Sequence, residues 1–215
     1  MATTGKTSVT VWVREGTRKS LTEALDKQKT RKIVLSSSDR WQTLGLPRNE
    51  AVQVRARWKA EVQRMRQAGE LLDVVDALAV FGITQELEAR GWATRRFKQA
   101  PPEARLPGRW PGSRDGGYKE SIHLQLPSKT AARVLNACWA TSAPYIARLR
   151  DWRDRNPGIV VPRGQLDADE LTGPLAEYER LAARVTTVGD IYRAGLLRGI
   201  RKAESLEFLY AKQKP

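Results

Sequence analysis

The chain of 215 residues carries 38 Lys and Arg against 24 Asp and Glu, which gives a formal net charge of +14 at pH 7. With 40% hydrophobic residues, it is long enough to bury the core of one large domain or of two small ones. A single cysteine and a single histidine exclude an internal disulfide, a cysteine-rich zinc site and catalysis by a pair of histidines.

The first elements expected along the chain are a strand, a helix and a second strand. Apolar and polar residues alternate over residues 7–14, which is typical of a half-buried strand. Helical spacing of apolar positions predicts a helix over residues 17–29, and residues 32–36 indicate another strand. We expect Trp12, on the polar side of the first strand, to be covered by a neighbouring element; an exposed Trp12 would instead be a stacking platform for bases.

Residues 47–67 predict an amphipathic helix with a strongly cationic surface. One apolar stripe runs along the helix, and Lys and Arg cover much of the remaining surface. Three of these cations, Arg55, Lys59 and Arg66, are candidate contacts to a phosphate backbone. The residues that follow, 71–81, are apolar nearly all round and predict a buried helix in the core of the first domain.

The most strongly basic stretch lies at residues 91–133, with nine Lys and Arg against three acidic residues. Two short runs of extended character, 91–99 and 119–126, flank an insert rich in Pro and Gly. We expect these runs to pair as a basic β-ribbon with a long loop at its tip. A ribbon of this kind fits a nucleic-acid groove, where cations neutralise phosphates and strand side chains reach base edges. The alternative is a solvated hairpin without a ligand.

Two helix starts follow the ribbon. Pro127 and the serine after it begin one helix, and Ser142, with Pro144 just inside, indicates the start of a second. The fold class expected is therefore α+β, mostly helical, with a small N-terminal sheet and a basic β-ribbon in the middle of the chain. We expect a nucleic-acid-binding domain over residues 1–156 and a helical region for dimerisation or partner contact over residues 157–215.

Part of this region resembles a known DNA-binding family. The run ESIHLQLPSKTAARVLNACWATSAPYIARLRDW resembles a ribbon-helix-helix unit, which has an alternating strand, a proline, a first helix and a second helix opened by Ser or Thr. In that family the polar strand residues of two paired chains enter the major groove. The resemblance implies that Ser121, His123 and Gln125 read bases, that Ser142 binds phosphate at a helix N-terminus, and that the protein is a homodimer.

Two further resemblances concern neighbouring segments. The run ARVTTVGDIYRAGLLRGI is similar to the second helix of the ribbon-helix-helix family. The runs LEARGWATRRFKQ and RDGGYKESIHLQLPSKTAARVLNA together resemble the wing of winged-helix regulators, in which a helix ends in Arg-Gly, a basic hairpin follows, and the chain leaves into a long helix. Both families bind duplex DNA.

We expect a double-stranded DNA-binding protein without enzymatic activity, cofactor or metal. Its role would be that of a transcriptional regulator or of an accessory factor of a plasmid or phage. Residues 1–150 hold 27 Lys and Arg against 14 Asp and Glu, and a polyanionic partner accounts for this imbalance. The candidate nucleic-acid-binding residues are Arg55, Lys59, Arg66, Arg95, Arg96, Lys98, Arg109, Arg114, Lys119, Ser121, His123, Gln125, Lys129 and Ser142.

Two other functions remain open. Seven tryptophans among basic residues would suit a single-strand or RNA-binding subunit of a ribonucleoprotein, because bases stack on aromatic rings. A Mg²⁺-dependent nuclease would need carboxylates, which Asp167, Asp169 and Glu170 could supply together with Asp73 or Asp76. The phosphate-binding motif GxxxxGK[ST], the dinucleotide motif GxGxxG after a strand and the nucleophile motif GxSxG do not occur.

The expected location is the cytoplasm. No apolar run approaches the roughly 20 residues that a membrane span needs, and the first ten residues lack the pattern of a secretory signal. We therefore expect no membrane partner, and either a homo-oligomer or a subunit of a larger complex that binds nucleic acid.

Overall fold

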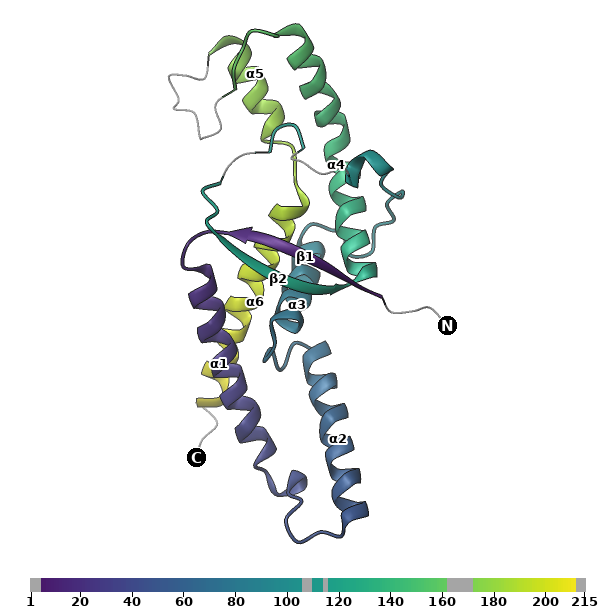
Figure 1. The fold of residues 1–215 in the computed structure, drawn as a ribbon, viewed down its shortest axis with the longest axis vertical. Coiled ribbons are helices and arrows are strands. Elements are labelled where there is room, and N and C mark those ends of the chain that lie inside the picture. The colour runs from purple at the N-terminus through teal and green to yellow at the C-terminus, as the bar shows by residue number, and fades with distance from the viewer. Residues whose placement is uncertain (1–4, 106–109, 114–115, 162–171, 212–215) are drawn as a thin grey trace. The chain divides into compact units, whose positions relative to one another are not determined.

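The computed structural model describes residues 5–105, 110–113, 116–161 and 172–211 (Figure 1). Their order along the chain is β1 Lys6–Val13, α1 Thr17–Ser36, η1 Asp39–Trp41, α2 Arg48–Gln67, α3 Val75–Ala89, η2 Pro102–Arg105, β2 Glu120–Pro127, α4 Ser128–Arg155, α5 Gly173–Ala182 and α6 Val188–Ala211. Helices dominate, and the two strands form one antiparallel sheet, so the expected α+β class is confirmed. Among the described helices, none is both long enough and apolar enough to cross a bilayer.

The chain forms two compact units. Unit 1 comprises residues 1–15 and 87–193, and unit 2 comprises residues 16–86 and 194–215. The division falls within α3 and α6. The expected boundary after residue 156 stays a prediction.

Unit 1 is organised around the pairing of β1 with β2. The register places Lys6 opposite Pro127 and Val13 opposite Glu120. The alternation in both strands sends one set of side chains to the core, as the period of two residues requires. Its buried members are Val11, Val13, Ile122, Leu124 and Leu126.

The start of α4 is tied directly to β1. The Ser128 backbone N–H and the Ser128 hydroxyl both donate to the carbonyl oxygen of Gly5, at 2.9 and 2.7 Å. The same hydroxyl lies 3.0 Å from Oγ1 of Thr7. Since α4 follows β2 without a break, these contacts fix both strands against the helix that leaves them.

The far end of α4 packs against α5. Leu149, Trp152, Tyr178 and Leu181 form a buried cluster there, in which the rings of Trp152 and Tyr178 lie 5.0 Å apart. The indole N–H of Trp152 donates to the carbonyl oxygen of Pro174 at 2.9 Å, so its one polar group is satisfied.

Unit 2 has a core of aliphatic side chains that includes three buried polar residues, Gln28, Asp73 and Glu86. The carboxylate of Glu86 accepts a hydrogen bond from Nε of Arg198 at 2.5 Å. The fully buried Gln28 donates to the carbonyl oxygen of Ala203 at 2.7 Å and accepts from the backbone N–H of Leu72 at 3.3 Å. Close helix packing is possible because Gly82 lies against Gly195, where a Cβ at Gly82 would overlap the Gly195 carbonyl oxygen. The carboxylate of Asp73 is paired with the cationic side chains of Arg66 and Lys32.

Several expected elements are wrong in detail. Residues 32–36 are the last turns of α1 rather than a strand, and the helix expected from residue 71 begins at Val75. Residues 91–99 form no strand, so the partner of β2 is β1 and not the segment just before it. β1 has the same length as β2 and the same alternation of polar and apolar residues. It therefore forms cross-strand pairs with β2 better than residues 91–99, which lack this alternation.

The second helix start expected at Ser142 is also wrong. Ser142 and Pro144 lie inside the single helix α4. Ser142 does not cap a helix, because its hydroxyl is buried and bonded elsewhere: it donates to the carbonyl oxygen of Thr186 at 3.0 Å and accepts from the Thr186 N–H at 2.9 Å.

Candidate nucleic-acid interface

The outward side of the sheet in unit 1 is the best candidate for an interface. We call its side chains the ribbon face: Lys6, Ser8, Thr10, Trp12, Ser121, His123 and Gln125. All are exposed except the half-buried Ser121. The opposite side of both strands is buried or half-buried, and so the core presents this row of side chains to solvent on a fixed backbone.

The ribbon face is built of cross-strand pairs. Ser8 stands opposite Gln125, Thr10 opposite His123, and Trp12 opposite Ser121. Oγ1 of Thr10 lies 3.0 Å from Nδ1 of His123, and the tautomer of the ring decides which atom donates. The contact engages Nδ1, so Nε2 is the ring nitrogen that remains for a ligand.

The charge on this face suits an anionic ligand. The outward positions of β1 and β2 include Lys6 and no carboxylate. Arg14 is exposed just beyond β1, and Lys129 is exposed in the first turn of α4. Lys119 lies 3.2 Å from Glu15, but both side chains are about three-quarters exposed, and such a surface pair is weak.

Trp12 is 55% exposed, which corrects the expectation that another element would cover it. Its backbone is held in place from unit 1 itself: Nη1 of Arg193 donates to the Trp12 carbonyl oxygen at 3.3 Å. The guanidinium of Arg193 also lies 3.9 Å above the ring of Tyr118 and 2.5 Å from Oδ1 of Asp190. The indole ring is therefore exposed at a strand end whose backbone is held in place by Arg193.

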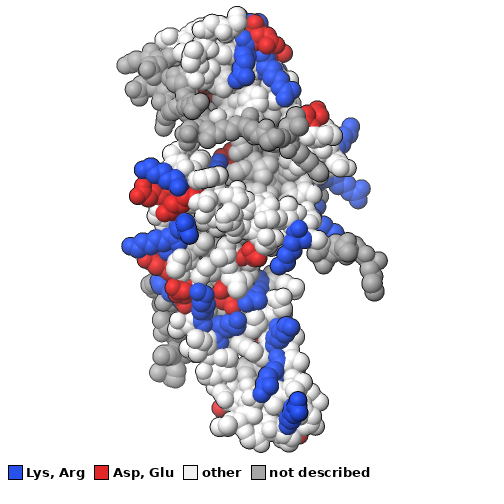
Figure 2. Space-filling view, in the orientation of Figure 1, with Lys and Arg blue, Asp and Glu red and all other residues white. Residues whose placement is uncertain are grey.

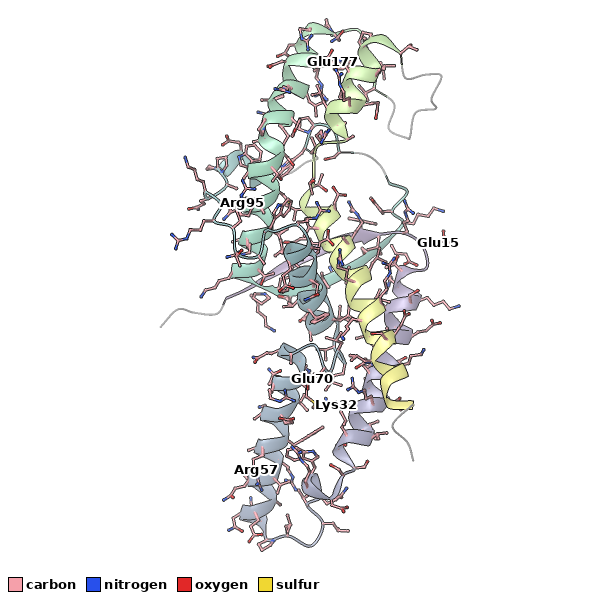
Figure 3. All side chains as sticks on the ribbon, turned by 180° about the vertical axis from the view of Figure 1, so that it is seen from behind. Glu15, Lys32, Arg57, Glu70, Arg95 and Glu177 are labelled. Carbon is pink, nitrogen blue, oxygen red and sulfur yellow. The ribbon has the colours of Figure 1, made fainter. Side chains whose placement is uncertain are left out.

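The segment before β2 supplies cations rather than a strand. Arg95, Arg96 and Lys98 are exposed in irregular structure, and Arg95 is labelled in Figure 3. The segment is anchored to α4, because Arg133 donates to the carbonyl oxygens of Trp92 and Ala93. The other two cations expected on this loop, Arg109 and Arg114, lie outside the described residues.

The candidate cations of α2 belong to unit 2. Arg55 and Lys59 are exposed, and Arg57, labelled in Figure 3, is exposed between them. Lys and Arg side chains follow α2 along the face shown in Figure 2. These side chains form a cationic surface that belongs to unit 2.

Arg66 has a structural partner. Its Nε and Nη2 lie 2.7 and 2.8 Å from the two carboxylate oxygens of Asp73, and Lys32 Nζ lies 2.9 Å from the same carboxylate. Burial raises the pKa of Asp73, but the hydrogen bonds from Arg66 and Lys32 outweigh burial and hold the pKa below its ordinary value. This arrangement balances a buried charge without needing a ligand.

The expected role of Ser142 in phosphate binding is contradicted by its position. The residue is fully buried in the middle of α4, bonded to the backbone of Thr186. The helix N-terminus that would have supplied donors to a phosphate does not occur there.

The tryptophans do not form a shared stacking surface. All seven lie in described segments, and Trp12 is the one among them that is exposed. Trp92 and Trp152 are buried, Trp41 packs on Trp58, and Trp110 packs edge-on against Trp139.

The carboxylates considered for a nuclease are not brought together in the described part of the chain. Asp167, Asp169 and Glu170 lie outside the described residues, and Asp73 is bound by Arg66 and Lys32. Within the described segments, no group of three or more His, Cys, Asp and Glu could hold a metal ion.

Sequence reasoning found one half of the ribbon face and missed the other. Ser121, His123 and Gln125 lie where the alternation placed them, whereas Ser8, Thr10 and Trp12 were not recognised as their neighbours. The sequence signal that could have identified β1 as the partner of β2 is the alternation of residues 7–14, which matches β2 in length and pattern although it lies far away in the chain. No family model, curated protein or solved structure matches this chain.

Proposed function

We propose that this protein binds duplex DNA by inserting the ribbon face into the major groove. The observation that supports the proposal is a two-stranded sheet whose outward side is exposed, polar and without carboxylates. Neighbouring strands lie about 4.8 Å apart, and the major groove, about 12 Å wide, admits such a ribbon with its side chains.

The side chains on the face have the chemistry that base readout uses. Gln pairs with the N6 and N7 edge of adenine, Ser and Thr bond to several base edges, and an apolar ring contacts the methyl group of thymine. Gln125, Thr10 and Trp12 supply these three kinds of contact. His123 adds a ring nitrogen that donates or accepts according to its tautomer.

Affinity would come from the cations of unit 1 around the face. Lys6, Arg14 and Lys129 are exposed next to the strand ends, and Arg95 and Arg96 are exposed before β2. Each phosphate that these cations neutralise contributes about −0.9 to the slope of log K against log salt concentration on B-DNA. A transcriptional regulator or an accessory factor of a plasmid or phage is the role that such binding would serve.

The test is a selection from random duplex and single-stranded pools, followed by titration of the best ligands. We expect enrichment of a duplex motif, with affinity falling steeply as salt rises. Changing Ser121, His123 and Gln125 together to Ala should abolish preference for that motif. A matched control changes three exposed neutral side chains of unit 2, Thr22, Gln53 and Gln63, to Ala and should leave the preference intact.

Enrichment of single strands without a duplex motif would contradict the proposal. It would favour the single-strand or RNA-binding alternative, for which the exposed ring of Trp12 is the supporting observation. In that case Trp12→Ala should reduce affinity more than the triple Ala variant does.

A further inference from the structure

The ribbon face is completed within one chain. β1 and β2 pair over eight positions, from Lys6 opposite Pro127 to Val13 opposite Glu120. The homodimer implied by the ribbon-helix-helix resemblance would instead bring one strand from each of two chains. No second copy is therefore needed to form a two-stranded reading surface.

The two halves of this surface correspond under an approximate local twofold. An antiparallel pair of strands has a twofold axis normal to the sheet. When this axis passes between Thr10 and His123, it maps each outward position of β1 onto an outward position of β2. Ser8 then corresponds to Ser121, and Trp12 corresponds to Gln125.

The corresponding residues at one pair of positions have different chemistry. Ser8 and Ser121 are identical, and Lys6 corresponds to Lys119 just before β2. Trp12 and Gln125 are not interchangeable, because the amide of Gln both donates and accepts towards adenine, whereas the indole offers an apolar ring and one donor. A palindromic site would present the same base edge to both, and one of the two contacts would be poor.

We propose that a single copy of this chain recognises a non-palindromic duplex site, and that Trp12 and Gln125 set its polarity. This inference rests on the proposed function. The outward residues from Ser8 to Trp12 span four residue steps, roughly 13 Å. The directly contacted core of the site is therefore about four base pairs long, at 3.4 Å per base pair.

Two measurements on the full chain test the inference. The first is the symmetry of the motif enriched by wild-type protein from a random duplex pool. The second is the number of chains on that duplex, measured by native mass spectrometry and by sedimentation. We expect a motif without twofold symmetry and one chain on each duplex.

A variant makes the test specific to the two residues. Trp12→Gln places Gln at both corresponding positions, at an exposed site where the change should leave the fold intact. The motif of this variant should become more symmetric, with adenine preferred at both ends. Gln125→Ala should relax the preference at one end alone. Thr22→Ala, on the exposed side of α1, serves as the control and should leave the motif unchanged.

The possible failures are distinguishable. A palindromic wild-type motif bound by two chains would overturn the inference while leaving duplex binding in place. An unchanged motif for Trp12→Gln would overturn the assignment of polarity to Trp12. A pool from which no duplex motif emerges would overturn the proposed function itself, and the inference with it.

Discussion

Thr10 and His123, far apart in the chain, meet across β1 and β2 with 3.0 Å between Oγ1 and Nδ1. Both side chains are exposed, and both lie on the outward side of the sheet. Because the contact restrains the His123 ring before any ligand arrives, less rotational freedom is lost on binding. The pair therefore has the position and the preorganisation expected of a base-reading contact.

The first prediction concerns this pair. His123→Ala should weaken binding to the selected duplex by about 1–3 kcal/mol, the range of a good base contact, or roughly 5- to 150-fold. Thr10→Val, which removes the hydroxyl but keeps the shape, should have a smaller effect. Fluorescence anisotropy at several salt concentrations measures both changes.

The salt dependence separates base reading from phosphate binding. His123→Ala removes no phosphate contact if the proposal holds, so the slope of log K against log salt concentration should be unchanged. Equal weakening on selected and random duplexes would assign His123 to the backbone rather than to the bases.

The second prediction concerns Asp73, which is almost fully buried beneath Arg66 and Lys32. Asp73→Asn should lower the free energy of unfolding by about 2–3 kcal/mol. This is less than the ~3–5 kcal/mol for breaking a fully buried pair, because both cations keep part of their exposure to water. Urea unfolding followed by circular dichroism measures the change. Asp26→Asn, at an exposed pair with Lys29, is the control and should change stability by less than about 0.5 kcal/mol.

The same carboxylate predicts an acid dependence. Its folded-state pKa is lowered from the ordinary value of 3.8, so its contribution is complete above the unfolded pKa and is lost as pH falls through the folded one. The difference in stability between wild type and Asp73→Asn should therefore be largest near neutral pH and should shrink below about pH 4. A difference that stays constant down to pH 2 would show that the Asp73 charge has no stabilising role.

The third prediction concerns the close approach of Gly82 to Gly195 in unit 2. Ala in place of Gly favours a helix by about 1 kcal/mol, but here a Cβ would overlap the backbone of α6. Since backbone cannot rotate aside as a side chain does, Gly82→Ala should be destabilising by about 2 kcal/mol or more in spite of that gain. Gly158→Ala, where nothing lies within 4 Å, is the control. Unchanged thermal unfolding of Gly82→Ala would mean that the helices do not pack this closely.

Local patterns predicted some elements well and others poorly. The extended run that became β2, the helix start at Ser128 and the first strand each have a strong local signal. Residues 32–36 were expected to form a strand because Ile33 and Val34 favour strands, but both residues are exposed on the last turns of α1. A helix already under way adds one hydrogen bond for each residue fixed, and this outweighs a weak strand preference.

One strand of the ribbon face could be predicted from the sequence and the other could not, and the reason differs from that for residues 32–36. Alternation assigns Ser121, His123 and Gln125 to one face, but it does not say which strand lies beside them. A neighbouring partner was expected because hairpins close short loops, whereas β1 is more than a hundred residues away in sequence. The cost of closing a long loop rises only slowly with its length, so a distant strand with a matching pattern competes well.

Ser142 was misassigned since a Ser shortly before a Pro also fits inside a helix when the hydroxyl finds a tertiary partner such as Thr186.

The last prediction uses Cys138, a free thiol in the core of unit 1. Burial raises the pKa of this thiol to about 12. At pH 8 roughly one thiol in ten thousand would then be ionised in the folded protein, against about a quarter in an unfolded chain. Labelling by iodoacetamide should therefore be slow in the native protein and fast in guanidinium chloride. Comparable rates in the two conditions would mean that Cys138 is not enclosed.

Slow labelling of Cys138 also reports on duplex binding without any substitution. A reagent that reaches the thiol only after unit 1 opens should react in proportion to the open population, and a ligand that binds the closed form reduces that population. Duplex at a hundred times its dissociation constant should slow labelling about 100-fold if opening destroys the ribbon face. A duplex that binds with the same affinity but leaves the labelling rate unchanged would place its binding site outside unit 1, on a surface such as α2. The experiment thus tests which of the two cationic surfaces binds the ligand.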